Sequence, residues 1–352
     1  MSPTSNHCGS QRLIRLNEKL AIGQGCPTFL AAEIGGNHGG DQALARKMIE
    51  AAAEAGADGV KFQAYRTDKF LSGLSPYYQE LRAEELPFKA LGELAATAHD
   101  LGLAVGLTVF DQAGLELADR CRADFIKISS GDLTYHRLLN QAALVGRPLF
   151  VSTGAATEAE VLAALEALAP ARERLVLMQC AAIYPAPPES ANLAVMSGWM
   201  SQGMLAGYSD HTIGLDAPMM AIALGAAVLE KHFSTDRHLP GGDNSISALP
   251  DDFKSLARWK SVCQTLHGQT DKKPHPLEET IRPLFRRAVV ASRDLAAGRR
   301  LTESDLALKR PASAAHILGP ECFDRLIGAT LKAEIKEGEA LTKIHLADRP
   351  DG

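Results

Sequence analysis

The chain has 352 residues, of which 46% are hydrophobic and 22% charged, a composition typical of a globular protein with one large domain and a small one. A formal net charge of −5 provides no general attraction to nucleic acid or to an anionic membrane, so neither is expected as a partner. No run approaches the roughly 20 apolar residues of a membrane span, and six scattered cysteines without a CxxC pair indicate reduced thiols in a cytoplasmic protein.

Short β-branched runs alternate with longer Ala- and Leu-rich helical runs between about residues 28 and 266. The expected strands cover 28–35, 59–65, 104–110, 125–130, 148–154, 175–181, 204–210 and 228–234. Strict alternation predicts parallel strands joined by helical crossovers, and about eight such units in roughly 240 residues is the size of a (β/α)₈ TIM barrel of the α/β class. An open doubly wound sheet is the alternative, but no GxGxxG-type loop follows the first strand.

One of the expected helices begins with a capping box. The hydroxyl of Thr157 can accept a hydrogen bond from the amide three residues on, while Glu160 reaches back to the cap. This pairing predicts a helix that starts directly after the fifth strand.

The C-terminal part of the chain contains a short internal repeat, in which residues 293–306 resemble residues 333–346. The matching pairs are Gly298 and Gly338, Leu301 and Leu341, Thr302 and Thr342, and Leu306 and Leu346. Each copy predicts a strand, a glycine turn and a short capped helical turn. The domains expected are an N-terminal extension (1–20), the barrel (21–267), a polar, proline-containing linker (268–283) and a small β-rich domain (284–352). The last is small enough that we expect it to dock elsewhere.

Polar side chains follow a two-residue spacing at the C-terminal ends of the expected strands. Residues two apart on a barrel strand share a face, and barrel enzymes carry their catalytic groups at these ends. The pairs are Lys61 and Gln63, Lys127 and Ser129, Ser209 and His211, and Glu230 and His232. Lysines in a barrel mouth are costly unless they face anions. With the hydroxyls of Thr108, Ser130, Ser152 and Ser209 they predict a phosphate or carboxylate pocket. The alternative is a set of solvated rim residues.

His211 and His232 end the seventh and eighth strands, which are neighbours in a closed barrel. Two imidazoles one strand spacing apart can share a divalent cation and leave its other positions for water and substrate. Such an open site suits a Lewis acid, so both are predicted metal ligands, although a lone histidine is more often a packing residue. Glu33 closes the first strand and could transfer protons or bind hydroxyls; the alternative is an ion pair with Lys61. Asp243, in a GGD turn, can reach the same mouth.

The order of several motifs resembles the N-acetylneuraminate (sialic acid) synthase family. These motifs are AEIGGNHGG, VKFQAY, FIKISSGD, VSTGA, CAAIYPAP, GYSDHT, LEKHF and LPGGDNSISALPDDF. The tail contains RDLAAGRRLTESDLALKRP and LIGATLKAEIKEGEALT, and it resembles that family's antifreeze-like SAF domain. The resemblance covers the chain from about residue 20. It implies condensation of phosphoenolpyruvate (PEP) with an N-acetylated mannose-type sugar, which releases phosphate and forms a nine-carbon α-keto acid.

The resemblance also implies roles for individual residues, matched motif by motif. PEP would be held by Lys61, Thr108, Lys127, Ser130, Ser152 and Ser209. Mn²⁺ or Mg²⁺ would be bound by His211 and His232, and the acceptor sugar by Glu33, Gln63, Tyr184 and Asp243. Either Glu33 or Asp132 would activate the attacking water. Arg310 matches an arginine that enters the partner subunit's barrel, which implies a domain-swapped homodimer.

Four features depart from the family pattern, and three of them lie on the acceptor side. Asp132 is one methylene shorter than the acid of the KIGSGE-type motif, and Ala182 replaces an asparagine that lies between PEP and acceptor. PGPD has become PGGD directly before and at Asp243, and loop 66–88 does not match the family's sugar-contacting segment. The acceptor is therefore left open between N-acetylmannosamine and a legionaminate-type, pseudaminate-type or other aldose.

Two other functions compete with this one. A Schiff-base pyruvate aldolase would use Lys127 as its nucleophile. A catalytically inactive sugar-binding or scaffold protein would use the SAF domain as an interaction module, although the intact set of lysines, histidines and acids argues against it.

Overall fold

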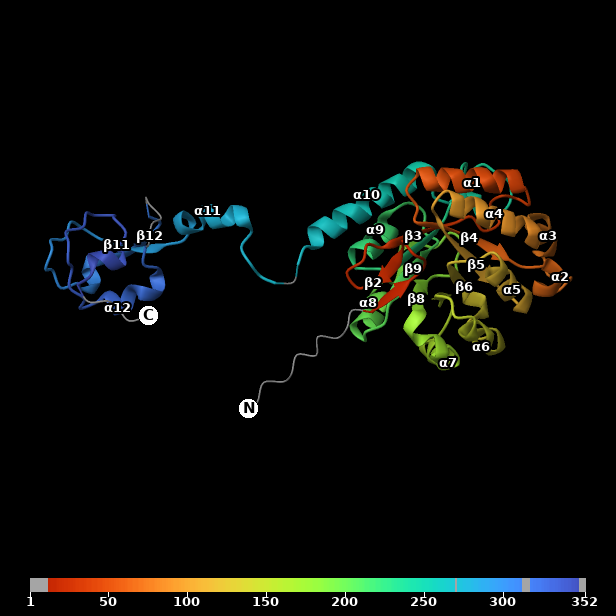
Figure 1. Cartoon of the computed structure of the whole chain (residues 1–352), viewed down its shortest axis with the longest axis horizontal. Coiled ribbons are helices and arrows are strands. Elements are labelled where there is room, and N and C mark those ends of the chain that lie inside the picture. Colours follow the sequence, from red (N-terminus) through yellow and green to blue (C-terminus); the bar gives the residue numbers. More distant parts are fainter. Residues whose placement is uncertain (1–11, 270, 312–316, 348–352) are drawn as a thin grey trace. The chain divides into compact units, whose positions relative to one another are not determined.

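The computed structural model describes residues 12–269, 271–311 and 317–347. The chain divides into two compact units between Gly268 and Gln269 (Figure 1). The first unit is a closed barrel of eight parallel strands surrounded by helices, which confirms the predicted (β/α)₈ fold. Among the described residues, no helix has both the length and the apolar character needed to cross a membrane.

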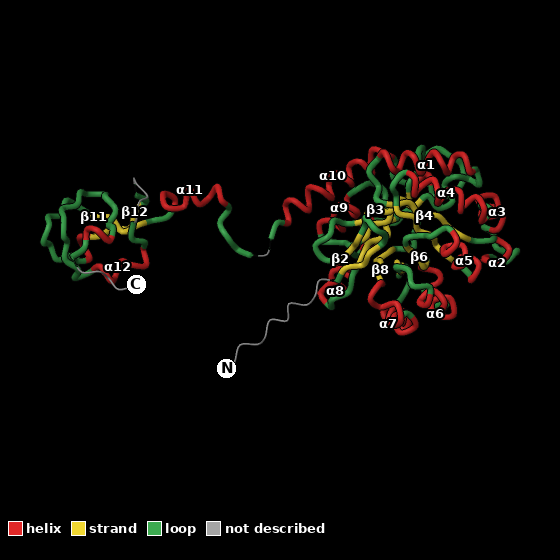
Figure 2. Tube along the Cα trace, viewed as in Figure 1, coloured by secondary structure: helices red, strands yellow, loops and turns green. Residues whose placement is uncertain are grey.

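The barrel strands follow one another in chain order around the ring, and β10 closes it by pairing with β3. They are β3 (Phe29–Glu33), β4 (Gly59–Ala64), β5 (Ala104–Val109), β6 (Phe125–Ile128), β7 (Leu149–Ser152), β8 (Leu175–Cys180), β9 (Ala206–Asp210) and β10 (Val228–His232). The main helices are α1 (Gln42–Glu54), α4 (Phe88–Asp100), α5 (Gln112–Arg120), α6 (His136–Leu144), α7 (Glu158–Ala167), α8 (Ala194–Ser201), α9 (Asp216–Ala223) and α10 (Pro250–His267). Figure 2 shows the yellow strands enclosed by these red helices.

The barrel interior changes character along its axis. Its N-terminal part is filled by aromatic side chains, among which the rings of Phe125 and Phe150 stack with centroids 4.4 Å apart. Gly106 makes room for this layer, since a Cβ there would lie 2.1 Å from the Phe125 ring. Apolar packing therefore fills the N-terminal part of the barrel interior, and a cavity opens at the C-terminal ends of the strands.

A short hairpin belongs to the barrel unit as well. It consists of β1 (Leu13–Arg15) and β2 (Ala21–Gly23), and its Ile14 and Ile22 are buried in the same cluster as Phe29. The sequence places β1 in a separate extension at 1–20, of which residues 1–11 lie outside the described part. The apolar ends of the barrel strands need cover from water, and this hairpin provides it.

Two local predictions concern the segments that connect strands and helices. Helix α7 begins with the expected capping box, in which the Thr157 amide donates to Glu160 at 2.7 Å and the Glu160 amide donates to the Thr157 hydroxyl at 3.3 Å. The loop without a family match, 66–88, contains two short helices, α2 (Thr67–Phe70) and α3 (Tyr78–Glu84).

The second unit begins with a helix where an irregular linker was expected. Helix α11 (Pro276–Phe285) covers half of the stretch 268–283, because His275 and Glu278 form a capping box at its start. Strands β11 (Ala288–Ala291) and β12 (Leu306–Lys309) pair antiparallel. The 3₁₀ turn η5 (Glu303–Asp305) lies between these strands, and η6 (Pro320–Cys322), the short helix α12 (Phe323–Leu326) and η7 (Lys343–His345) follow them.

The internal repeat has the same local structure in both copies. Gly298 and Gly338 have φ angles of 81° and 79°, which favour glycine, and Thr302 and Thr342 each cap a 3₁₀ turn. The expected first strands are reduced to one bridge, between Leu295 and Ile335.

Candidate active site

A cavity of about 200 Å³ opens at the C-terminal ends of the barrel strands. All eight strands, or the residues directly after them, contribute to its lining. The predicted site residues that line it are Glu33, Lys61, Gln63, Thr108, Lys127, Ser130, Ser152, Tyr184, Ser209, His211, His232 and Asp243. Strand parity, together with the loops that follow β6, β8 and β10, thus brings residues from positions 33 to 243 into one pocket.

The floor of the cavity is a network of buried ion pairs. Lys61 Nζ lies 2.6 Å from Glu33 Oε2 and donates to the hydroxyl of Thr108 at 2.5 Å. Lys127 Nζ lies 2.6 Å from Glu230 Oε1, which is also 3.9 Å from Lys61 Nζ. The alternative of a solvated rim is therefore wrong for both lysines, which are only 2% and 3% exposed. The alternative of an ion pair between Glu33 and Lys61 is present, but inside the barrel.

Glu230 has no role assigned from the sequence, although parity places it on the same face as His232. It accepts from Lys127 and from the Ser209 hydroxyl, at 2.6 Å and 3.2 Å. A glutamate two residues before the last inward-facing histidine is the signal that could have identified it, since a buried carboxylate requires a cation.

The two buried carboxylates have opposite pKa shifts. Burial raises the pKa of Glu33, and the attraction of Lys61 does not offset it. Burial would also raise the pKa of Glu230, but Lys127 and Lys61 outweigh that effect and lower it to about 2. Glu230 is thus a fixed anion, whereas Glu33 is the carboxyl better suited to exchanging a proton.

Several polar atoms in the cavity have unused hydrogen-bonding capacity. Within the described residues, the hydroxyl of Ser152 and Oε2 of Glu230 are buried without a partner. The Ser130 hydroxyl accepts from the Gly154 amide at 2.9 Å, which leaves its own proton to donate. Hydroxyl donors beside two ammonium groups form a site in which an anion's oxygens can be bound.

His211 and His232 lie side by side, with ring centroids 5.4 Å apart. Nδ1 of His211 donates to the Ala181 carbonyl at 2.7 Å, so its Nε2 keeps a free lone pair. Nδ1 of His232 is buried without a hydrogen bond among the described residues, 3.5 Å from Asp243 Oδ2. Burial lowers the pKa of both rings and favours neutral imidazoles, the form that binds metals. The ring of Tyr184 lies 4.0 Å from that of His211.

Two predicted site residues lie outside this cavity lining. Asp132 accepts from the Ser129 hydroxyl at 2.6 Å, and burial raises its pKa, but the cavity is bordered by Ser129, Ser130 and Gly131 instead. Arg310 belongs to the second unit, where its guanidinium carbon lies 4.5 Å from the centroid of the Phe285 ring. The structure therefore favours Glu33 over Asp132 as the acid closest to the reacting groups.

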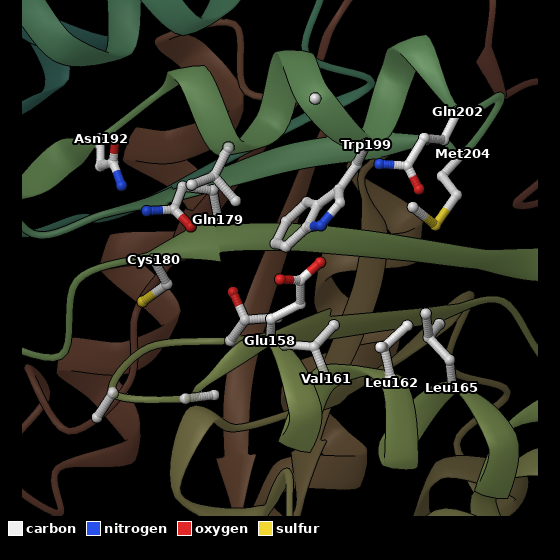
Figure 3. A pocket seen from close by; sticks show the side chains of 15 residues that line it. Glu158, Val161, Leu162, Leu165, Gln179, Cys180, Asn192, Trp199, Gln202 and Met204 are labelled. Atoms are coloured by element: carbon white, nitrogen blue, oxygen red, sulfur yellow. The ribbon is translucent and has the colours of Figure 1, made fainter.

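A second, larger cavity of about 440 Å³ lies in the helical layer between α7 and α8 (Figure 3). Figure 3 shows Trp199 and Gln202 at the top, opposite Glu158 and Val161 below, with Gln179 and Cys180 from the end of β8 at the left. Among the described residues that line it, Glu158 alone is charged. Cys180 borders both cavities, but the groups with shifted pKa values concentrate in the smaller one.

The comparison with known proteins agrees with this geometry. The NeuB family model matches residues 48–272, and the SAF domain model matches residues 286–347. The chain belongs to the NeuB family. It is 33% identical to the N,N'-diacetyllegionaminic acid synthase of Legionella pneumophila, over 96% of this chain and 99% of that one. It is 30% identical to the N-acetylneuraminate-9-phosphate synthase of Mus musculus, over 91% and 93% of the two chains.

A solved structure of the same family is also similar. The N-acetylneuraminic acid (sialic acid) synthetase from Leptospira borgpetersenii superposes with a TM-score of 0.74 at 30% identity, covering 78% of this chain and 98% of that one. The family inferred from the motifs is therefore confirmed, together with the C-terminal SAF domain.

Proposed function

We propose that this NeuB-family synthase condenses PEP with an N-acetylated hexose and releases a nonulosonic acid and phosphate. The observation that carries the proposal is the pair of buried lysines beside the Ser152 hydroxyl, which has no partner among the described residues, at the C-terminal mouth of the barrel. PEP has two anionic ends, a phosphate and a carboxylate, and such a pocket offers cations and donors to both.

Lys61 and Lys127 would offset the charge of PEP, and nearby hydroxyls would donate hydrogen bonds to its oxygens. The hydroxyls are those of Thr108, Ser130, Ser152 and Ser209, all of which line the cavity. Because the ammonium groups are already fixed by Glu33 and Glu230, they need little reorganisation during the reaction.

The reaction balances with one water per turnover. The π electrons of PEP form a bond from carbon 3 to the aldehyde carbon, and the aldehyde oxygen gains a proton. Water adds to carbon 2 and loses one proton, which balances the proton gained by the aldehyde oxygen. The hydroxyl formed on carbon 2 then loses its proton to the departing phosphate as the carbon–oxygen double bond of the keto acid forms. The bond from carbon 2 to the phosphate oxygen breaks in the same step, and phosphate leaves with the electron pair. Glu33 lines the cavity with a raised pKa, which suits it to exchange these protons.

A divalent cation fits the two histidines. Both imidazoles are buried, their lowered pKa values favour the neutral form, and each has a ring nitrogen without a hydrogen bond from the described residues. The described residues contain no group of three His, Cys, Asp or Glu able to hold a metal, so water and substrate would complete the coordination. Bound there, Mn²⁺ or Mg²⁺ would act as a Lewis acid towards the sugar aldehyde.

The acceptor sugar would lie on the outer side of the cavity, between Gln63, Tyr184 and Asp243. Ala182 borders the same space and leaves more room than the asparagine of the sialic acid synthase motif. This extra room favours acceptors of the legionaminate or pseudaminate type as alternatives to N-acetylmannosamine.

The assembly implied by the family is a domain-swapped homodimer in the cytoplasm. Arg310 would enter the barrel of the partner and contact the acceptor. Free cysteines, as found for the five in the described residues, are compatible with a reducing compartment.

A phosphate-release screen tests the proposal. PEP would be offered together with N-acetylmannosamine, its 6-phosphate, or deoxy-diamino hexoses, in the presence of Mn²⁺ or Mg²⁺. We expect phosphate and a nine-carbon acid, detected by mass spectrometry, in equal amounts with at least one acceptor. Absence of aldose-dependent phosphate release with all of them would contradict the proposal.

A further inference from the structure

Three loops from distant parts of the chain meet beside Asp243. The first is the loop after β3, the second is the C-terminal end of α3, and the third is the loop after β10. The carboxylate of Glu84 lies where they meet. Glu84 is 8% exposed, and its Oε1 accepts from the Gly242 amide at 2.5 Å. The packing is close, since a Cβ on Gly36 would lie 2.2 Å from Glu84 Oε2. Glu84 does not line the catalytic cavity, so it acts through the loop that it holds.

Asn37 holds the same loop from the other side. It is fully buried, its Oδ1 accepts from the Asp243 amide at 2.8 Å, and its Nδ2 donates to the Phe233 carbonyl and the Ser247 hydroxyl, each at 2.8 Å. The backbone before and at Asp243 is thus fixed by two side chains. The Asp243 carboxylate itself lines the cavity, with Oδ2 3.5 Å from Nδ1 of His232.

The contact with Glu84 depends on a glycine where the sialic acid synthase motif has proline. Gly242 has a φ of 54°, whereas proline is restricted to about −65°, and proline has no amide hydrogen to donate. Even an alanine Cβ at this position would lie 2.8 Å from Asn37 Oδ1. PGGD in this chain is therefore a differently built loop, and Glu84 is its partner.

Helix α3, which carries Glu84, is itself anchored to the barrel. The hydroxyl of Tyr65, directly after β4, donates to the Leu81 carbonyl at 3.0 Å, and Glu85 accepts from the Thr67 amide at 2.8 Å. The segment 66–88, which has no match in the family pattern, thus connects the end of β4 to the loop that carries Asp243.

We propose that Glu84 and Gly242 form a clasp that positions Asp243 and so determines which acceptor sugar this enzyme accepts. The inference rests on the proposed function, because it concerns the acceptor side of that same cavity. Glu84 is a positioning residue, and its contact links the segment with no family match to the loop that departs from the family motif. The unmatched segment 66–88 and the PGGD loop then act together to determine acceptor specificity.

Steady-state kinetics separate this role from a general structural one. Glu84→Gln keeps the accepting oxygen, and we expect it to stay within about threefold of wild type. Glu84→Leu removes the oxygen, and we expect the KM for the acceptor to rise about tenfold or more while the KM for PEP changes less than about twofold. Glu50→Leu, on the exposed face of α1, is the matched control.

A double-mutant cycle tests the partnership itself. Gly242→Pro removes the donated hydrogen, so adding Glu84→Leu to it should change the acceptor KM by less than about twofold. If the two substitutions instead raise the acceptor KM independently, so that their fold-changes multiply in the double variant, the clasp would be overturned. An unchanged acceptor KM in soluble, folded Glu84→Leu would overturn its role in specificity.

Hydrogen exchange provides a readout that does not need turnover. Peptides covering residues 240–247 should exchange faster in Glu84→Leu than in wild type or Glu84→Gln, with no change in peptides from α5. Equal exchange in all three proteins would refute the clasp. If wild type releases no phosphate with any aldose, the proposed function fails, and the exchange data still decide whether the clasp exists.

Discussion

Two of the cavities in the described part of the barrel unit, the one at the barrel mouth and the one between α7 and α8, differ in the charge of the side chains that line them. The cavity between α7 and α8 has about twice the volume of the one at the barrel mouth, but of its described lining residues only Glu158 is charged. The smaller cavity contains two lysines, two glutamates and two histidines, all buried. Buried charge, rather than volume, is therefore what distinguishes the candidate active site from the other cavity.

The physical reason is the cost of removing charges from water. Each buried ion costs several kcal/mol unless a partner compensates it, so a core rarely keeps such groups without a function. At the mouth, Lys127 and Glu230 compensate each other, and Lys61 is shared between Glu33 and Thr108. The cavity between α7 and α8 has no comparable arrangement among its described lining residues, since its polar groups are mostly neutral amides.

The largest effect is expected at Lys127. Lys127→Met should lower kcat/KM by about a thousandfold, because an ammonium facing the PEP anion is lost. It should also destabilise the protein, since Glu230 is left buried without its closest cation. Adding Glu230→Gln should restore the melting temperature but not the activity, which separates catalysis from folding. Trapping of a pyruvate adduct on Lys127 by borohydride would instead support the aldolase.

The second effect concerns the histidine pair. His232→Ala should lower activity about a hundredfold or more and abolish its dependence on added Mn²⁺ or Mg²⁺, because one of two imidazole ligands is lost. Activity measured against metal concentration after EDTA treatment checks this. His238→Ala, in an exposed loop, is the control and should behave as wild type. Normal turnover of His232→Ala in EDTA would show that the pair binds no catalytic metal.

A smaller effect is expected at Arg310. Arg310→Ala should raise the KM for the acceptor about tenfold with little change in the KM for PEP, because one charged hydrogen-bond donor to the sugar is lost. The adjacent exposed Lys309 provides a matched control, Lys309→Ala. The oligomeric state measured by analytical ultracentrifugation completes the test. A monomer with full activity would refute the swapped arrangement.

The smallest effect is expected in the cavity between α7 and α8. Trp199→Phe should change kcat/KM by less than about twofold and the free energy of unfolding by less than about 1.5 kcal/mol, as for other apolar replacements of similar shape. Kinetics and urea unfolding measure both. A large loss of activity at unchanged stability would show that the two cavities are coupled through Cys180, which they share.

Local patterns in the amino-acid sequence were sufficient to predict the barrel, the repeat and most of the residues that line the cavity of the candidate site. Alternation of strands and helices predicts the fold, and two-residue parity predicts which side chains face the lumen. Lys61, Lys127, His211 and His232 could therefore be placed at one rim before their neighbours were known.

Which of these groups are partners depends on the folded chain. Lys127 and Glu230 are 103 residues apart, and Glu84 and Gly242 are 158 apart, so no local pattern connects them. The hairpin that covers the aromatic end of the barrel depends on the fold in the same way. Asp132 differs, because it accepts from Ser129 within its own turn, three residues away, and so does not line the cavity. Pairing across a closed barrel depends on the register of all its strands together, and only the tertiary structure contains that information.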